Sequence, residues 1–229
     1  MNFISIKSGT TVEGAEIEAF RTESRSQKWI YLIAGVHGDE VEGVYCLQQL
    51  FDWLKNNDDL PQTPMVVIPI LNIDGYRAGT RTNSHGVDLN RNLPAKSWSN
   101  VAREAKYFPG THAMSEPENV YLDKLFQKFP PAFIVSFHSW KPMLNINGNC
   151  RKFAEIMHDH NQYPIIDDIE GHPTPGSMGD YAPEKYNAPV LTLEFPVLSD
   201  GKTLKEIWDE NSSALKALIE SSELQKIIQ

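Results

Sequence analysis

Four side chains that can bind a metal ion or transfer protons follow apolar stretches of the sequence: His37, Glu40, His138 and Glu194. Imidazole nitrogens and carboxylate oxygens both suit zinc, so His37 and Glu40, three residues apart on a glycine-containing turn, could bind one ion. A lone His-x-x-Glu motif also fits a polar turn with a helix-capping carboxylate, and a single histidine often belongs to a protein core. The motif therefore needs support from the rest of the chain.

Three apolar runs determine where these side chains would lie. They cover residues 29–35, 132–138 and 190–194, and their continuous apolar character is typical of strands buried on both faces of a mainly parallel sheet. The carboxyl ends of parallel strands share one edge of the sheet, so we expect the four side chains to converge there. Two histidines and a glutamate form the ligand set of a catalytic zinc site with one open position, which leaves Glu194 as the general base beside the water.

The remaining patterns predict the architecture that supports this site. We expect a single α/β domain over residues 1–229, with a mixed, mainly parallel central sheet and helices on both faces. Apolar residues recur at helical spacing in segments 41–54, 151–161 and 204–228. Residues 65–71 predict a further buried strand. Helices and strands thus alternate along most of the chain, as the fold class requires.

Capping residues and short alternating runs predict where further helices and strands begin and end. Ser115, with Glu118 three residues later, predicts the start of a helix. Two short alternating runs, 3–6 and 16–20, predict a hairpin at the edge of the sheet. Residues 72–112 show almost no periodicity, and a segment of this length is normally functional or disordered. Its many aromatic and apolar residues favour a functional segment.

Composition excludes several classes of partner. Lysine and arginine number 21 against 30 acidic residues, a formal charge of -9, whereas a nucleic-acid-binding surface needs clustered cations. No stretch approaches the roughly 18 apolar residues of a membrane helix, and the first residues do not resemble a signal peptide. The two cysteines, Cys46 and Cys150, are too few for a disulfide framework. We therefore predict a cytoplasmic enzyme with no nucleic-acid or membrane partner, and leave its oligomeric state open.

Several motifs, in the same order along the chain, resemble those of the M14 zinc carboxypeptidases. These motifs are His37-x-x-Glu40, Asn-Ile-Asp-Gly at 72–75, Arg81, Gly-Val-Asp-Leu-Asn-Arg-Asn at 86–92, Ser-Phe-His-Ser at 136–139 and Thr-Leu-Glu-Phe-Pro at 192–196. In its compact length and in the sequences of residues 88–92 and 194–196, the chain most resembles the murein peptide amidase subgroup of this family. The resemblance implies a zinc metallopeptidase or amidase that hydrolyses the bond between γ-D-glutamate and meso-diaminopimelate in murein tripeptide, during cell-wall peptide recycling.

The resemblance also implies catalytic roles for particular residues. His37, Glu40 and His138 would hold one zinc ion per chain. Glu194 would activate the water and later protonate the leaving amine, and Arg81 would polarise the scissile carbonyl. Whether a second metal binds stays open.

Substrate-binding roles follow from the same resemblance. Asn90 and Arg91 would bind the free carboxylate of a small peptide, for which a planar guanidinium is well shaped. Asp88 would orient a zinc-bound histidine, and Ser139 would lie at the wall of the next subsite. The family has a tyrosine in a mobile loop where this sequence has His172, so the resemblance leaves substrate preference less defined than the metal set.

Diaminopimelate has a second ammonium and carboxylate far from the scissile bond. Arg77, His172 and Asp180 are the candidates for binding that distal end. Three alternatives remain: a general M14 carboxypeptidase, an aspartoacylase-like deacylase and a catalytically silent binding protein. The deacylases usually carry an added β domain, whereas the roughly 35 residues after Glu194 have a helical pattern. Silent relatives typically lose a ligand or the base, and this sequence retains them all.

Overall fold

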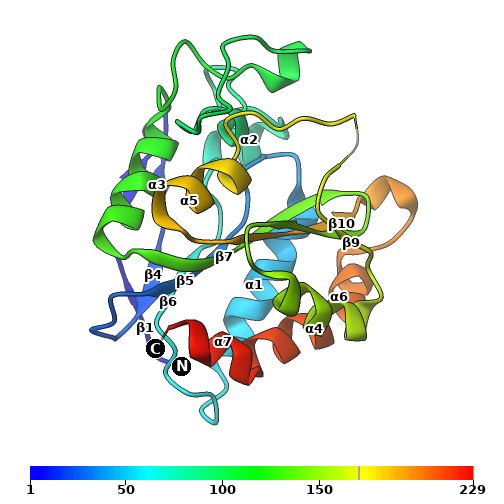
Figure 1. Ribbon diagram of the computed structural model, residues 1–229. Helices are drawn as coiled ribbons and strands as arrows, with labels where there is room; N and C mark the ends of the chain where they lie inside the picture. The colour runs from blue at the N-terminus through cyan, green and yellow to red at the C-terminus, as the bar shows by residue number, and fades with distance from the viewer. Residues whose placement is uncertain (170, 229) are drawn as a thin grey trace.

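The computed structural model describes residues 1–169 and 171–228, and a twisted eight-stranded sheet runs through its centre (Figure 1). In their order across the sheet, the strands are β1 (Phe3–Ser5), β4 (Phe20–Thr22), β6 (Met65–Ile68), β5 (Trp29–Ile33), β7 (Pro131–Trp140), β10 (Val190–Pro196), β8 (Met143–Asn147) and β9 (Ile165–Ile166). The four central strands β6, β5, β7 and β10 are parallel, and β8 is antiparallel to β10. The predicted mixed, mainly parallel sheet is confirmed.

Helices cover both faces of this sheet, as the sequence predicts (Figure 1). One face carries α1 (Val41–Lys55), α4 (Arg151–Asn161), α6 (Leu204–Glu220) and α7 (Ser222–Ile227). The other face carries α3 (Pro117–Lys128) and α5 (Met178–Tyr186). Ile30 and Leu32 of β5 pack into the first layer, and Tyr31 and Ile33 pack into the second. The apolar run of β5 lacks alternation because both of its faces are buried.

A tight turn after β5 directs the chain back toward the sheet edge. Gly35 has a φ of 62°, a conformation that side chains with a Cβ rarely adopt. A Cβ on Gly38 would lie 2.0 Å from the backbone carbon of Gly75 in α2 (Ile73–Ala78), so the turn packs directly against that helix. His37 lies between Gly35 and Gly38, and its position is therefore determined by backbone packing rather than by a flexible loop.

The predicted amino-terminal pairing of 3–6 with 16–20 forms only in part: Ser5 pairs with Phe20, and the Ile6 amide donates to the Ala19 carbonyl at 2.8 Å. β1 pairs with β4, whereas β2 (Gly9–Thr10) and β3 (Glu16–Ile17) form a separate two-stranded sheet. β1 does lie at the edge of the main sheet, as expected. Strands of two or three residues contain too little alternation to specify a partner, so β4 is placed by its long-range pairing with β6.

Two helix boundaries also differ from the predictions. Ser115 does not cap α3: Glu116 occupies the N-cap position, and the Ser115 hydroxyl accepts a hydrogen bond from Asn92 Nδ2 at 2.9 Å. The segment 204–228 is two helices, because Ser221 ends α6 and its hydroxyl accepts from the Leu224 amide to start α7. A side-chain hydrogen bond therefore marks the start of α7, whereas the N-cap residue of α3 makes no side-chain capping bond.

The irregular segment 72–112 contains only short helices: α2, η1 (Leu89–Arg91) and η2 (Ala105–Tyr107). Asn92 anchors it, since its side-chain amide donates to the carbonyls of Pro109 and His112. The sequence did not predict β8, β9 or α5. Among the described residues, no helix is both long and apolar enough to cross a bilayer. The domain boundary of 1–229 and the cytoplasmic location stay predictions.

Candidate active site

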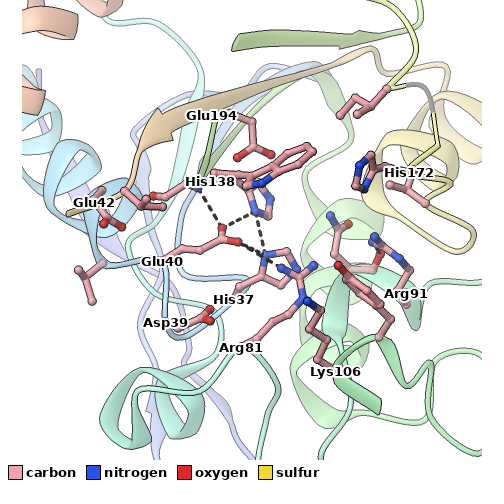
Figure 2. A pocket seen from close by; sticks show the side chains of 18 of the residues that line it. His37, Asp39, Glu40, Glu42, Arg81, Arg91, Lys106, His138, His172 and Glu194 are labelled. Atoms are coloured by element: carbon pink, nitrogen blue, oxygen red, sulfur yellow. Dashed lines mark hydrogen bonds and ion pairs between the residues drawn. The ribbon is translucent and has the colours of Figure 1, made fainter. Parts of the chain in front are cut away.

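Parallel strand register brings the separated motifs together. His138 lies in β7 and Glu194 in β10, and the two residues are direct partners in the parallel register. His37 and Glu40 follow β5, the neighbour of β7 on its other side. Figure 2 shows the four side chains pointing into one pocket. The expected convergence at the carboxyl edge of the sheet is therefore what the fold produces.

His37, Glu40 and His138 form a compact, buried cluster. Glu40 Oε1 lies 2.7 Å from His37 Nδ1, and Glu40 Oε2 lies 2.8 Å from His138 Nδ1. The two Nδ1 atoms are 3.1 Å apart, and all candidate ligand atoms lie within 4.8 Å of one another. None of the three residues is more than 8% exposed. The cluster offers two nitrogens and a carboxylate to one small volume.

Each imidazole ring is oriented by a second residue, which contacts the ring nitrogen that faces away from Glu40. His37 Nε2 lies 3.1 Å from Asp88 Oδ1, and His138 Nε2 lies 3.0 Å from Ser136 Oγ, so each contact can fix a proton on Nε2. A neutral imidazole with its proton on Nε2 presents a lone pair at Nδ1. Both Nδ1 atoms lie beside Glu40, where they would present these lone pairs to a bound cation. The arrangement matches the usual pattern in which a metal-binding histidine donates its other ring proton to a neighbouring acceptor.

Three electron-rich groups this close together fit a bound cation. Tetrahedral zinc ligands at about 2.0–2.2 Å from the ion are roughly 3.3–3.6 Å apart, slightly wider than the spacing in this cluster. Burial alone would raise the pKa of Glu40, but the imidazoles of His37 and His138 hold that pKa well below its usual range. Glu40 is thus an ionised carboxylate inside the protein, as a metal ligand must be.

Glu194 has the properties of a proton-transfer group. Its Oε2 atom is buried and makes no hydrogen bond within residues 1–169 and 171–228. Burial, reinforced by the negative charge of Glu40, raises the pKa of Glu194 to about 7. A carboxyl group with this pKa can accept a proton and return it near neutral pH. Glu194 lines the same pocket as the ligand cluster (Figure 2).

Arg81 connects the cluster to its outer shell of charges. Its Nε and Nη2 atoms both lie 3.0 Å from Asp88 Oδ2, and its Nη1 lies 3.3 Å from Glu40 Oε1. Asp88 is fully buried; burial would raise its pKa, but His37 and Arg81 keep that pKa well below its usual range. Asp88 therefore holds a histidine and an arginine together, which places the guanidinium beside the candidate metal position.

Asn90 and Arg91 line one side of the pocket, whose volume is about 730 Å³. Asn90 Oδ1 accepts from the amide of Met178, the first residue of α5, at 2.8 Å. This bond leaves the amide donors of Asn90 for another partner. Arg91 is 8% exposed and donates to the Asn90 carbonyl, so most of its donors also stay available. The two residues together can bind a carboxylate.

Two other expected substrate contacts also line the pocket. The Ser139 hydroxyl is buried and has no hydrogen-bond partner among the described residues. His172 packs against Trp140 with ring centroids 4.8 Å apart. Figure 2 places His172 on the same side of the pocket as Arg91.

The structure does not bring Arg77 or Asp180 to the pocket lining. Arg77 is exposed in the last turn of α2. Asp180 lies in α5, where it accepts from Ser97 Oγ at 2.5 Å. Neither residue is among those that line the pocket. Sequence proximity to Arg81 and to the loop with His172 was therefore insufficient to place them.

Sequence reasoning missed a set of pocket residues that we call the cationic rim: Arg103, Lys106 and Tyr107. They lie on and beside η2, in the irregular segment. Arg103 Nη1 donates to the Gly171 carbonyl at 3.1 Å, and its Nη2 lies 3.3 Å from His172 Nδ1. The available signal was two basic residues, Arg103 just before the 104–107 turn and Lys106 within it, in an acidic chain.

Comparison with known proteins agrees with this site. Residues 2–168 match the model of the family described as "Zinc carboxypeptidase". Murein peptide amidase A of Escherichia coli K12 is 31% identical over 207 residues, which span 83% of this chain and 81% of that protein. The crystal structure of murein-tripeptide amidase from Escherichia coli O157 superposes with a TM-score of 0.74 at 28% identity, covering 95% of this chain and 92% of that one.

A more distant structure has the same fold. Carboxypeptidase A from Helicoverpa armigera superposes with a TM-score of 0.77 at 18% identity, covering 96% of this chain and 69% of that one. The resemblance inferred from the motifs is confirmed by these matches. The chain belongs to the M14 zinc carboxypeptidase family of hydrolases.

Proposed function

We propose that this chain is a zinc-dependent amidase that hydrolyses the γ-D-glutamyl–meso-diaminopimelate bond of murein tripeptide, in the cytoplasm. The observation that carries the proposal is the complete site on one sheet edge: a His-Glu-His cluster, a buried carboxyl with a raised pKa, and an arginine with open donors. The similarity to murein peptide amidase A over most of both chains supports the choice of substrate.

His37, Glu40 and His138 would hold the zinc ion, with Asp88 and Ser136 maintaining the two rings in the binding orientation. When bound, zinc supplies Lewis acidity, which polarises a carbonyl and makes water more acidic. Because Asp88 and Ser136 already contact the two rings, the side chains of the cluster need little rearrangement when the ion binds. Substitution of any of the three metal-binding residues should therefore weaken metal retention more than it destabilises the fold.

Glu194 serves as the general base and then as the general acid. Its carboxylate takes a proton from the attacking water and transfers it to the amine of diaminopimelate as the amide bond breaks. Arg81 lies beside Glu40, where its guanidinium can stabilise the negative charge that develops on the carbonyl oxygen. Asn90 and Arg91 bind the carboxylate next to the scissile bond and so fix the register of the substrate.

The direct test is hydrolysis of synthetic L-Ala-γ-D-Glu-meso-diaminopimelate by zinc-loaded protein, followed by mass spectrometry. A parallel panel contains ordinary α-linked peptides with free carboxyl termini and N-acyl amino acids. Release of diaminopimelate from the murein tripeptide at a rate far above the panel is expected. Faster hydrolysis of α-linked peptides would indicate a general carboxypeptidase, and faster hydrolysis of N-acyl amino acids would indicate a deacylase. The Glu194→Gln variant controls for contaminating peptidases.

A further inference from the structure

Positive charge in the pocket is concentrated around a single aromatic ring. The charged groups of Arg81, Arg91, Arg103 and Lys106 lie 5.2, 5.5, 4.5 and 5.1 Å from the ring centroid of Tyr107. The whole chain has a formal charge of -9, and carboxylates such as Glu40, Glu104 and Glu194 also line the pocket, so the positive charge is local to the end of the pocket around Tyr107. Like charges held together repel one another, and such a concentration is favourable when an anion binds among them.

Two of these cations already have carboxylate partners. Arg81 is paired with Asp88 and Glu40 beside the candidate metal position. Lys106 Nζ lies 3.3 Å from Glu104 Oε2 on the exposed surface of the irregular segment 72–112. Neither group is therefore the best candidate for binding a substrate carboxylate.

Arg91 and Arg103 have a different set of contacts. Arg91 donates to the carbonyl of Asn90, and Arg103 donates to the carbonyl of Gly171 and approaches Nδ1 of His172. Among the described residues these partners are neutral acceptors, so they orient the guanidiniums without neutralising them. Burial is the main cause that lowers the pKa of Arg91; the carboxylate of Asp88 opposes it, and the positive charges of Arg81 and Arg103 add to it, so a bound carboxylate would further stabilise the charged guanidinium.

The spacing of the two guanidiniums fits a dicarboxylate. Because their central carbons lie 5.5 and 4.5 Å from the same ring centroid, Arg91 and Arg103 are at most about 10 Å apart. The two carboxylate carbons of diaminopimelate are separated by six carbon–carbon bonds, about 7.5 Å when the chain is extended. One dicarboxylic residue can therefore reach both guanidiniums.

We propose that Arg103 determines specificity by binding a second carboxylate, on the side chain of the substrate's carboxyl-terminal residue, while Arg91 binds that residue's α-carboxylate. This inference rests on the proposed function, which places the carboxyl-terminal residue at the Asn90 and Arg91 side of the pocket. The substrate class is a peptide ending in a long-chain dicarboxylic amino acid. Tyr107 orients the guanidinium by stacking, and the contact with His172 links the cationic rim to the loop that carries His172.

The test uses three γ-D-glutamyl tripeptides that differ only in the last residue: meso-diaminopimelate, 2-aminopimelate and lysine. Diaminopimelate has both the distal carboxylate and the distal ammonium, 2-aminopimelate has the carboxylate alone, and lysine has the ammonium alone. For the wild type, we expect kcat/KM for the diaminopimelate peptide to exceed kcat/KM for the lysine peptide by at least about 100-fold. The 2-aminopimelate peptide should also be hydrolysed with a higher kcat/KM than the lysine peptide.

The variant Arg103→Gln should lower kcat/KM for both dicarboxylic peptides by at least about 10-fold and leave the lysine peptide within about twofold of the wild type. Arg103→Lys, which keeps the charge but loses the planar fork, should restore part of the loss. Arg25→Gln is the matched control, since Arg25 is an exposed arginine in the turn before β5, at the opposite end of that strand from His37. It should leave all three values unchanged.

An equal loss on all three peptides would overturn the inference, because Arg103 would then act on the fold or on the chemistry. Binding provides a second measurement that does not need turnover: calorimetric titration of wild type and Arg103→Gln with free diaminopimelate, 2-aminopimelate and lysine. Wild type should bind the two dicarboxylic amino acids more tightly, and the variant should lose that preference. If the wild type hydrolyses none of the peptides, the proposed function fails, and the calorimetric comparison still decides the role of Arg103.

Discussion

The candidate metal-binding end of the pocket and the cationic rim are built on different kinds of structure. His37, His138 and Asp88 are at most 3% exposed, and each makes a hydrogen bond to another buried polar residue. Arg103 and Lys106 are exposed and belong to an irregular segment. The first region is held by strand ends and a packed glycine turn, and the second by side-chain contacts between loops.

This difference separates two tasks. Chemistry needs ligand atoms held to within a fraction of an ångström, which strands and buried hydrogen bonds provide. Selection among substrates needs charges that can change without disturbing the fold, and exposed loop residues meet that need. Substitutions at the buried end should therefore alter metal binding and turnover for every substrate, whereas substitutions at the rim should alter only the choice among substrates.

The largest effect is expected from His138→Ala. Removal of one ligand from a three-residue set should abolish stoichiometric zinc retention and activity together, because two protein ligands hold the ion poorly. Metal content after dialysis, measured by atomic emission, checks this expectation. A variant that retains one zinc per chain would show that the ligand assignment is wrong.

Glu194→Gln should lower kcat by about 10²–10⁴-fold while zinc retention stays unchanged, because general-base catalysis has that typical magnitude. The base must be ionised to accept a proton, and its pKa is raised to about 7, so activity should fall as pH decreases through that region. A bound cation favours the ionised form and moves this limb to lower pH. A pH profile of kcat with no decrease on its acidic side would contradict the assignment.

Asp88→Asn tests whether the outer hydrogen bonds of the buried end matter. Asp88 holds both His37 and Arg81, and loss of such a partner typically weakens metal affinity by about 10–100-fold. Competition with a zinc chelator measures the change. Unchanged affinity would mean that the turn after β5 alone orients His37.

Arg91→Ala tests a residue between the two regions, since Arg91 is buried like the ligand cluster but lines the pocket. Its loss should lower kcat/KM by about 10–100-fold for a substrate with a free terminal carboxylate. The matching amide substrate should be affected much less, because it cannot form the charge-assisted contact. Equal losses for the acid and the amide would exclude Arg91 as the carboxylate-binding residue.

The smallest effect is expected from Lys106→Gln. Lys106 is exposed and pairs with Glu104, so solvent and salt screen its charge. At about 0.15 M salt, kcat/KM for the murein tripeptide should change by no more than about threefold. A loss as large as that predicted for Arg103→Gln would show that the whole cationic rim, rather than one arginine, selects the substrate.

Sequence patterns were sufficient for the buried parts of this fold. The runs before His37, before His138 and around Glu194 are long and apolar, so their strands and their convergence at one edge followed from burial alone. Short elements were missed or shifted: β8 and β9 were not predicted, and the strand that pairs with β1 runs from Phe20 to Thr22, beyond the predicted segment 16–20. Their residues have little periodicity, and long-range pairing decides their positions.

The sequence by itself determined the residue types that do the chemistry and the elements that carry them, because ligand identity and hydrophobic periodicity are local properties of the chain. Tertiary structure alone decided which substrate-facing residues surround the pocket. Arg77 is close to Arg81 in sequence but exposed on α2, whereas Arg103 meets Arg81 and Arg91 around Tyr107. Irregular segments follow no period, so the direction of their side chains depends on hydrogen bonds to distant loops, such as that from Arg103 to Gly171, which no local pattern encodes.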